Sequence, residues 1–164
     1  DHKGLGEVEQ ESEESLLARS TMEFLHENST YLSTGDIELI HGLASSARRG
    51  NEAAVDGMKL MLRSNPRQVN VLVTARALRN GREVCGLAIR YSHVSIPEQP
   101  RQFDRLSSPT QQTFSIAGSY NIWAERAGTA VSGKRQFEVG LGASGERTPE
   151  LEITQDIPGS ECRS

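Results

Sequence analysis

The apolar periodicity of the chain changes at Pro66, and this change limits the folds that the sequence can adopt more than any other feature. Before Pro66, apolar residues recur at helical spacing, whereas after Gln68 they alternate with other residues, as in Val71, Val73 and Ala75. The first pattern is typical of amphipathic helices and the second of strands. The sequence therefore predicts an α+β fold, with an N-terminal helical hairpin unit followed by an antiparallel β-sandwich of six to seven strands.

Four segments follow from the same patterns. Residues 1–14 are rich in Glu and Gly and predict a flexible acidic leader. Residues 15–66 form the predicted helical unit and residues 69–154 the β-sandwich domain. Residues 155–164 remain as a tail.

The helical unit contains three predicted helices, at about residues 15–27, 36–49 and 52–63. Ser33 is placed to cap the second helix, and Gly50 is placed to end it. The rhythm from Ala47 to Pro66 is similar to that of a tetratricopeptide hairpin. We find no second copy of it, and solenoids need about three repeats, so we expect an accessory hairpin.

Turn residues divide the second half into strands. Asn80-Gly81 favours a two-residue type I′ turn, which predicts a hairpin with the return strand at residues 83–92. The segment from Ser92 to Gln112 holds three prolines and is longer than most loops. It is a functional loop, a disordered one, or an edge strand around residues 102–106. The stretch 140–148 is predicted to be a glycine-rich loop.

Charge and cysteine content narrow the function classes. The net charge is -4, and Lys and Arg form no stripe of the kind that binds nucleic acid. No run reaches the ~20 apolar residues of a membrane-spanning helix. Cys85 and Cys162 would form a disulfide in an oxidising compartment. We otherwise expect a buried thiol at Cys85 and a free thiol in the tail.

The sequence contains no pattern typical of a metal, cofactor or catalytic site. The four histidines lack H-E-x-x-H spacing, and the two cysteines cannot supply a tetrahedral zinc site. No serine lies in a G-x-S-x-G elbow. We therefore expect no cofactor, no metal and no catalytic residue.

The run SIAGSYNIWAERAG, followed by VSGKRQFEVG, resembles PEGA-type and carboxypeptidase-regulatory-like (transthyretin-like) sandwich domains over about residues 69–154. The proline that usually opens the turn in this family is missing, because Ala117-Gly118 stands there. The resemblance implies Gly118 as the turn, Tyr120 and Ile122 as core, and Gly128 as the hairpin residue. It implies a domain that is usually not catalytic and that serves adhesion, scaffolding or accessory roles in bacterial envelope or secreted proteins.

The partner-binding residues that we predict are Trp123, Phe103, Arg101, Arg105 and Tyr91. Aromatic and Arg side chains are enriched in binding hot spots, and three prolines limit the entropy that the loop loses on binding. Two alternatives stay open. Trp123 covers the helical unit or the long loop, or it is exposed as a contact platform. Phe103 belongs to a partner surface, or it packs in the core of an irregular edge strand.

The sequence thus predicts a non-enzymatic structural or protein-interaction module of a larger extracytoplasmic or envelope assembly. We expect it in the periplasm, at the cell surface or secreted, with a protein partner, no nucleic acid and no membrane span. The alternative is an accessory carbohydrate- or peptide-binding domain of a secreted enzyme. An exposed Trp123 would favour that alternative.

Overall fold

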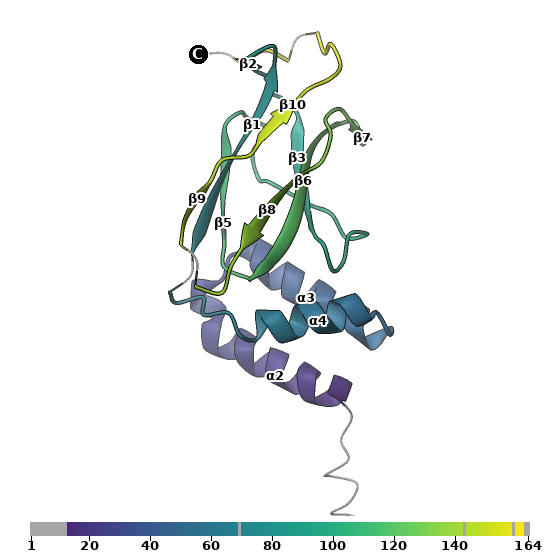
Figure 1. Cartoon of the computed structure of the whole chain (residues 1–164), viewed down its shortest axis with the longest axis vertical. Coiled ribbons are helices and arrows are strands. Elements are labelled where there is room, and N and C mark those ends of the chain that lie inside the picture. Colours follow the sequence, from purple (N-terminus) through teal and green to yellow (C-terminus); the bar gives the residue numbers. More distant parts are fainter. Residues whose placement is uncertain (1–12, 69, 143, 159, 163–164) are drawn as a thin grey trace, which may run out of the picture.

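The computed structural model describes residues 13–68, 70–142, 144–158 and 160–162. Most of the predicted acidic leader, residues 1–12, lies outside the described residues. A unit of helices lies at one end of the molecule and two sheets extend away from it (Figure 1). The C-terminus lies at the far end of the sheets, opposite the helices. The predicted α+β fold, a helical unit followed by a β-sandwich, is confirmed.

The helical elements are α2 (Glu13–Asn28), a short 3-10 turn (Ser29–Tyr31), α3 (Thr34–Arg48) and α4 (Glu52–Met61). Ser33 caps α3, because its Oγ accepts the Asp36 backbone N–H at 3.1 Å. Asn51 caps α4 in the same way, accepting the Ala54 N–H at 3.2 Å. Gly50 follows α3 with φ +89°, a conformation that glycine adopts without strain.

The strands are β1 (Val71–Arg79), β2 (Arg82–Glu83), β3 (Ala88–His93), β4 (Arg101–Gln102), β5 (Thr110–Phe114), β6 (Gly118–Arg126), β7 (Thr129–Ala130), β8 (Arg135–Val139), β9 (Gly145–Arg147) and β10 (Glu150–Glu152). One sheet is built around β1, which pairs with β2, β5, β9 and β10. The other has the order β4-β3-β6-β7, with β8 also on β6. The count exceeds six to seven because several strands have only two or three residues.

The Asn80-Gly81 turn is formed as predicted, but the return strand is not continuous. Both turn residues have positive φ, +53° and +78°, as a type I′ turn requires. Only β2 pairs back onto β1, whereas β3 pairs with β6 in the other sheet. The chain crosses between the sheets around Gly86, whose φ is +82°. The alternating apolar pattern continues on both sides of this break, so the sequence gives no signal for it.

Two strands near the C-terminus pair with β1 in parallel. They are β9, opposite Val71–Val73, and β10, opposite residues 76–78. The predicted glycine-rich loop over 140–148 was wrong for the part that forms β9. Its sequence, Gly-Glu-Arg, has no apolar residue, so periodicity could not reveal it. Only the folded structure identifies β9, through its parallel pairing with β1.

Buried side chains of the helices and of both sheets form one continuous hydrophobic cluster. Tyr120 and Ile122, the core residues that the resemblance implied, are fully buried. The Tyr120 ring stacks on Phe137 with the centroids 5.2 Å apart. The cluster extends into the helical unit through residues such as Leu43 and Met61. The helical unit thus closes one end of the sandwich core.

Cys85 and Cys162 form a disulfide, with the two Cα atoms 4.9 Å apart. Of the two alternatives that the sequence leaves open, the structure has the bonded one. The tail is also held by backbone contacts, since Cys85 N–H donates to the Ser160 carbonyl at 2.6 Å. The C-terminal segment is therefore fastened to the sandwich at the end opposite the helices.

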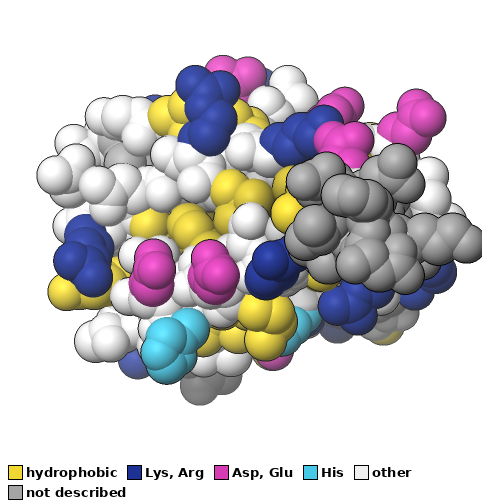
Figure 2. All heavy atoms as spheres, turned by 90° about the horizontal axis from the view of Figure 1, so that it is seen from below, with side chains coloured by type: hydrophobic (Ala, Val, Ile, Leu, Met, Phe, Trp, Pro, Cys, Tyr) yellow, Lys and Arg dark blue, Asp and Glu magenta, His cyan; other side chains and the backbone are white. Residues whose placement is uncertain are grey.

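The helical end shows hydrophobic side chains interleaved with charged ones (Figure 2). Leu16 and Met22, both on α2, are the most exposed hydrophobic residues there, at 48% and 56%. No helix in the described part of the chain has the length and apolar character needed to cross a membrane.

Candidate functional site

Of the five residues that the sequence singled out, the structure brings Tyr91 next to Phe103 and Arg101. Phe103 and Tyr91 are buried in the core, at 0% and 3% exposure. Trp123 is 5% exposed on the outer side of β6. Arg101 is half-buried and Arg105 is exposed. The long loop thus adopts the alternative of an irregular edge strand, because β4 pairs with β3 and Phe103 packs inside.

Tyr91 and Arg101 line a pocket of about 390 Å³ where α3 meets the sandwich. Tyr91 Oη accepts a hydrogen bond from Gln112 Nε2 at 2.9 Å. Arg101 forms an ion pair with Glu38 of α3 and also donates to the Glu38 carbonyl at 3.1 Å. Arg101 thus joins the sandwich to the helical unit, whereas the Tyr91 hydroxyl is bonded within the sandwich. We call this the junction pocket.

Asp36 is the charged group buried most deeply at this junction, with 3% of its surface exposed. Burial raises the pKa of its carboxyl to about 6, although hydrogen bonds from Ser33 and the Ser115 backbone act in the opposite direction. The nearby hydroxyl of Tyr91 has a pKa raised to about 12, mainly by burial. The junction therefore favours a protonated Asp36 at mildly acidic pH.

The Trp123 indole is covered by charged side chains on the outer face of its sheet. Its Nε1–H donates to Glu125 Oε2 at 2.6 Å, and Lys134 Nζ lies 4.7 Å from the ring centroid. Arg90, paired opposite Trp123 in the β3–β6 ladder, has its Nε 3.9 Å from Glu125 Oε1. The ring thus makes a cation–π contact with Lys134 and presents no open platform.

His93 is a buried histidine. Its Nδ1 accepts the Ser95 N–H at 3.1 Å, and its ring packs edge-on against Tyr120 at 5.1 Å. Burial lowers the pKa of the imidazole. Within the described ranges, no three His, Cys, Asp or Glu side chains are grouped so that they could hold a metal ion.

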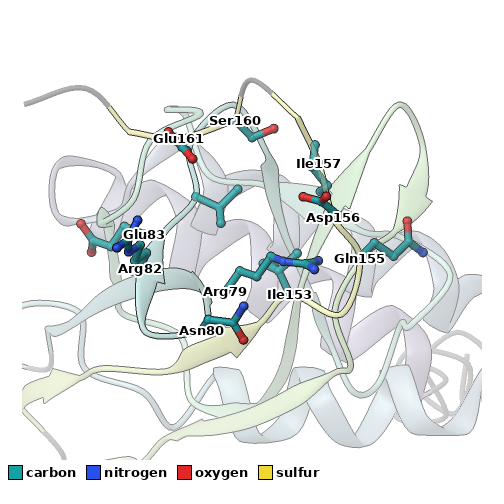
Figure 3. Close-up of a pocket in the computed structure, with 11 residues that line it drawn as sticks. Arg79, Asn80, Arg82, Glu83, Ile153, Gln155, Asp156, Ile157, Ser160 and Glu161 are labelled. Atoms are coloured by element: carbon teal, nitrogen blue, oxygen red, sulfur yellow. The ribbon is translucent and has the colours of Figure 1, made fainter.

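A second pocket, of about 430 Å³, lies at the end of the sandwich opposite the helices. We call it the distal pocket. One wall is the β1–β2 turn, with Arg79, Asn80 and Arg82, and the other is the C-terminal segment from Ile153 to Glu161 (Figure 3). Arg79 extends across the pocket toward Gln155 and Asp156 in this view. The site thus joins segments about 75 residues apart in the sequence.

The Cys85–Cys162 disulfide holds the C-terminal wall in place. Val84 and Glu161, the neighbours of the two cysteines, both line the distal pocket and pair through an isolated β-bridge. Ile153 anchors the start of the segment, because its N–H donates to the Leu78 carbonyl at 2.7 Å. Both ends of this wall are therefore fixed to the β1–β2 hairpin.

Charges of both signs face the distal pocket. Glu83 forms an ion pair with Arg76, which leaves four charged lining residues. No ion pair or hydrogen bond is formed by the side chains of Arg79, Arg82, Asp156 or Glu161 with other described residues. These four groups are therefore available to a ligand.

The sequence analysis missed the distal pocket. The signal that could have found it is the cysteine pair, because a Cys85–Cys162 bond brings the tail next to the Asn80-Gly81 turn. Arg79 and Arg82 flank that turn and would then have faced the tail. Because the sequence leaves this bond undecided, it does not predict the pocket.

No protein-family model and no curated protein matches the sequence. Among solved structures, the chain is similar to a candidate carbohydrate-binding protein from Bacteroides uniformis, with 13% identity over 51% of this chain and 40% of that one, and a TM-score of 0.34. It is also similar to a DUF3823 family protein from Parabacteroides merdae, with 14% identity over 52% and 46% and a TM-score of 0.37. A third is a minor pilin of Streptococcus agalactiae, with 10% identity over 56% and 48% and a TM-score of 0.36.

These likenesses are too weak to carry an argument about fold or function. The chain spans less than half of the length of each of the three proteins. The resemblance to PEGA-type and carboxypeptidase-regulatory-like domains remains a prediction, since no family model matches.

Proposed function

We propose that this chain is a non-catalytic binding module of a larger extracytoplasmic or envelope assembly, and that the distal pocket contacts its protein partner. The observation that carries this proposal is the construction of the pocket. It has about 430 Å³ of open volume, and a disulfide fixes one of its walls. Pockets of roughly 300–1,000 Å³ are the usual size for ligand sites, and a fixed wall lowers the entropy lost on binding.

The disulfide also supports the proposed location. Such bonds persist in oxidising compartments and are rare in the cytosol of most organisms. The bond closes a long loop, because the two cysteines are 77 residues apart in the sequence. A periplasmic, cell-surface or secreted protein would keep this bond and with it the C-terminal wall.

The position of the distal pocket suits a module within an assembly. The helical unit covers the opposite end of the sandwich and shares its core, so that end is already occupied. The distal end carries Arg79 and Arg82, whose side chains have no partner among the described residues, beside the apolar side chains of Ile153 and Ile157. Arginine next to apolar surface is a frequent combination in protein interfaces.

A fragment screen on the whole ¹⁵N-labelled chain tests the proposal. We expect backbone amide shifts to concentrate at residues 79–84 and 153–161, and not at the junction pocket. Gln155→Trp should fill the mouth of the distal pocket and abolish these shifts. Gln136→Trp, on the exposed side of β8, is the matched control and should leave them unchanged.

Shifts concentrated at the junction pocket or around Trp123 would contradict the assignment of the distal pocket. Monosaccharides belong in the same screen as a test of the carbohydrate-binding alternative. An exposed Trp123 would have favoured that alternative, but Trp123 is covered. If sugars alone moved the distal amides, the module would bind carbohydrate rather than protein.

A further inference from the structure

The two walls of the distal pocket carry opposite charges. Arg79 and Arg82 belong to the β1–β2 turn, whereas Asp156 and Glu161 belong to the C-terminal segment. Figure 3 shows Arg79 reaching across the pocket, with Asp156 on the far wall and Glu161 farther along the C-terminal segment. The pocket thus offers an anion site and a cation site on separate walls.

Apolar side chains lie in the same pocket. Val84 and Ile153 are buried, and Ile157 is half-buried beside Asp156. Transfer of an aliphatic group onto such a surface is favourable by about 25 cal/mol per Å² removed from water. A ligand that fits has an anionic group, a cationic group and an aliphatic part.

We propose that the distal pocket binds the charged backbone of a short zwitterionic peptide, with its carboxylate on Arg79 and its ammonium group on the Asp156 and Glu161 side. This inference rests on the proposed function for the position of the site and goes beyond it in the ligand, which is a free peptide rather than the protein partner. The Arg guanidinium matches a carboxylate through two parallel hydrogen bonds. Ile153 and Ile157 contact an aliphatic side chain of the peptide.

Other ligand classes fit the same charges less well. Asp156 and Glu161 would repel a phosphate or a dicarboxylate. Arg79 and Arg82 would repel a polyamine. A neutral sugar would cover charged groups without pairing them, which costs free energy. A zwitterion pairs both signs and adds no net charge.

The test is a titration of the whole ¹⁵N-labelled chain with the dipeptide Gly-Leu, compared with N-acetyl-Gly-Leu-amide, which lacks both charges. We expect Gly-Leu to shift amides at residues 79–84 and 153–161. The capped peptide should bind at least about tenfold more weakly, because it loses the charge-assisted hydrogen bonds at both ends.

Variants assign the two ends of the ligand. Arg79→Met should weaken Gly-Leu binding about tenfold or more, and Asp156→Asn together with Glu161→Gln should weaken it about fivefold or more. Arg48→Met, at an exposed position of α3, removes one charge far from the pocket and should change nothing. Unaltered amide spectra elsewhere show that each variant is folded.

Three results would overturn the inference: no shift with Gly-Leu up to about 10 mM, equal affinity for the capped peptide, or full affinity in the Arg79 variant. The proposed function fails separately. If neutral fragments move the distal amides while Gly-Leu does not, the pocket is a binding site and only the ligand class is wrong.

Discussion

The Phe103 ring packs edge-on against Tyr91 inside the sandwich, with the ring centroids 5.6 Å apart and both side chains buried. We therefore expect Phe103→Ala to lower the free energy of unfolding by about 3–5 kcal/mol, as is usual for a buried Phe. Arg105→Ala, at an exposed position two residues away, should change it by less than about 0.5 kcal/mol. Urea unfolding of the two variants measures both. If both variants changed the free energy of unfolding equally little, Phe103 would lie at the surface and would again be a candidate partner-binding residue.

Asp36 predicts a pH dependence of stability. Its pKa is about 6 in the folded protein and near 3.8 when unfolded, so the folded state binds the proton more tightly. The stability that this tighter proton binding contributes is complete below pH 3.8, and it is lost as the pH rises through 6. Between about pH 7.5 and pH 5 the free energy of unfolding should rise by about 1 kcal/mol from this group.

Asp36→Asn is the control for this prediction, because the amide oxygen can accept the same hydrogen bonds and does not titrate. The variant should lose that part of the pH dependence. Unfolding curves of both proteins at the two pH values give the comparison. An unchanged pH dependence in the variant would show that another group causes it.

Gly118 lies against His93, and its φ is +148°. A Cβ at this position would be 2.2 Å from His93 Nε2, so the imidazole or the strand has to move. We expect Gly118→Ala to cost about 2 kcal/mol or more in the free energy of unfolding, from overpacking and backbone strain together. Gly133→Ala is the matched control, since a Cβ there meets nothing within 4 Å. Equal melting temperatures for the two variants would contradict this close packing.

The sequence predicted the features that local residues determine. Ser33 marks a helix start by its own side chain, and Asn80-Gly81 carries the backbone preference of its turn. Strand β1 was readable because its buried Val and Ala residues alternate with larger or polar neighbours. These parts of the fold could be predicted without any tertiary contact.

The rest depends on contacts between distant segments. The sheet switch at Gly86 leaves the apolar alternation intact, so no local signal marks it. The covering of Trp123 by Lys134 depends on the segment between β7 and β8, which follows Trp123 in the chain by about ten residues. Phe103 was singled out because it stands between two arginines, Arg101 and Arg105, a pattern that fits a core residue of a short strand equally well. The distal pocket could be predicted only from a Cys85–Cys162 disulfide, because that bond brings its two walls together.

The fastened C-terminal wall is the central claim, and the state of its two cysteines in the native compartment tests it most directly. The protein should be isolated under a thiol-alkylating agent, digested and analysed by mass spectrometry. We expect a linked pair of peptides that contain Cys85 and Cys162, with no alkylated cysteine. Alkylation of both thiols would contradict it, because the distal pocket would then lack the bond that fixes its wall and the extracytoplasmic location would lose its support.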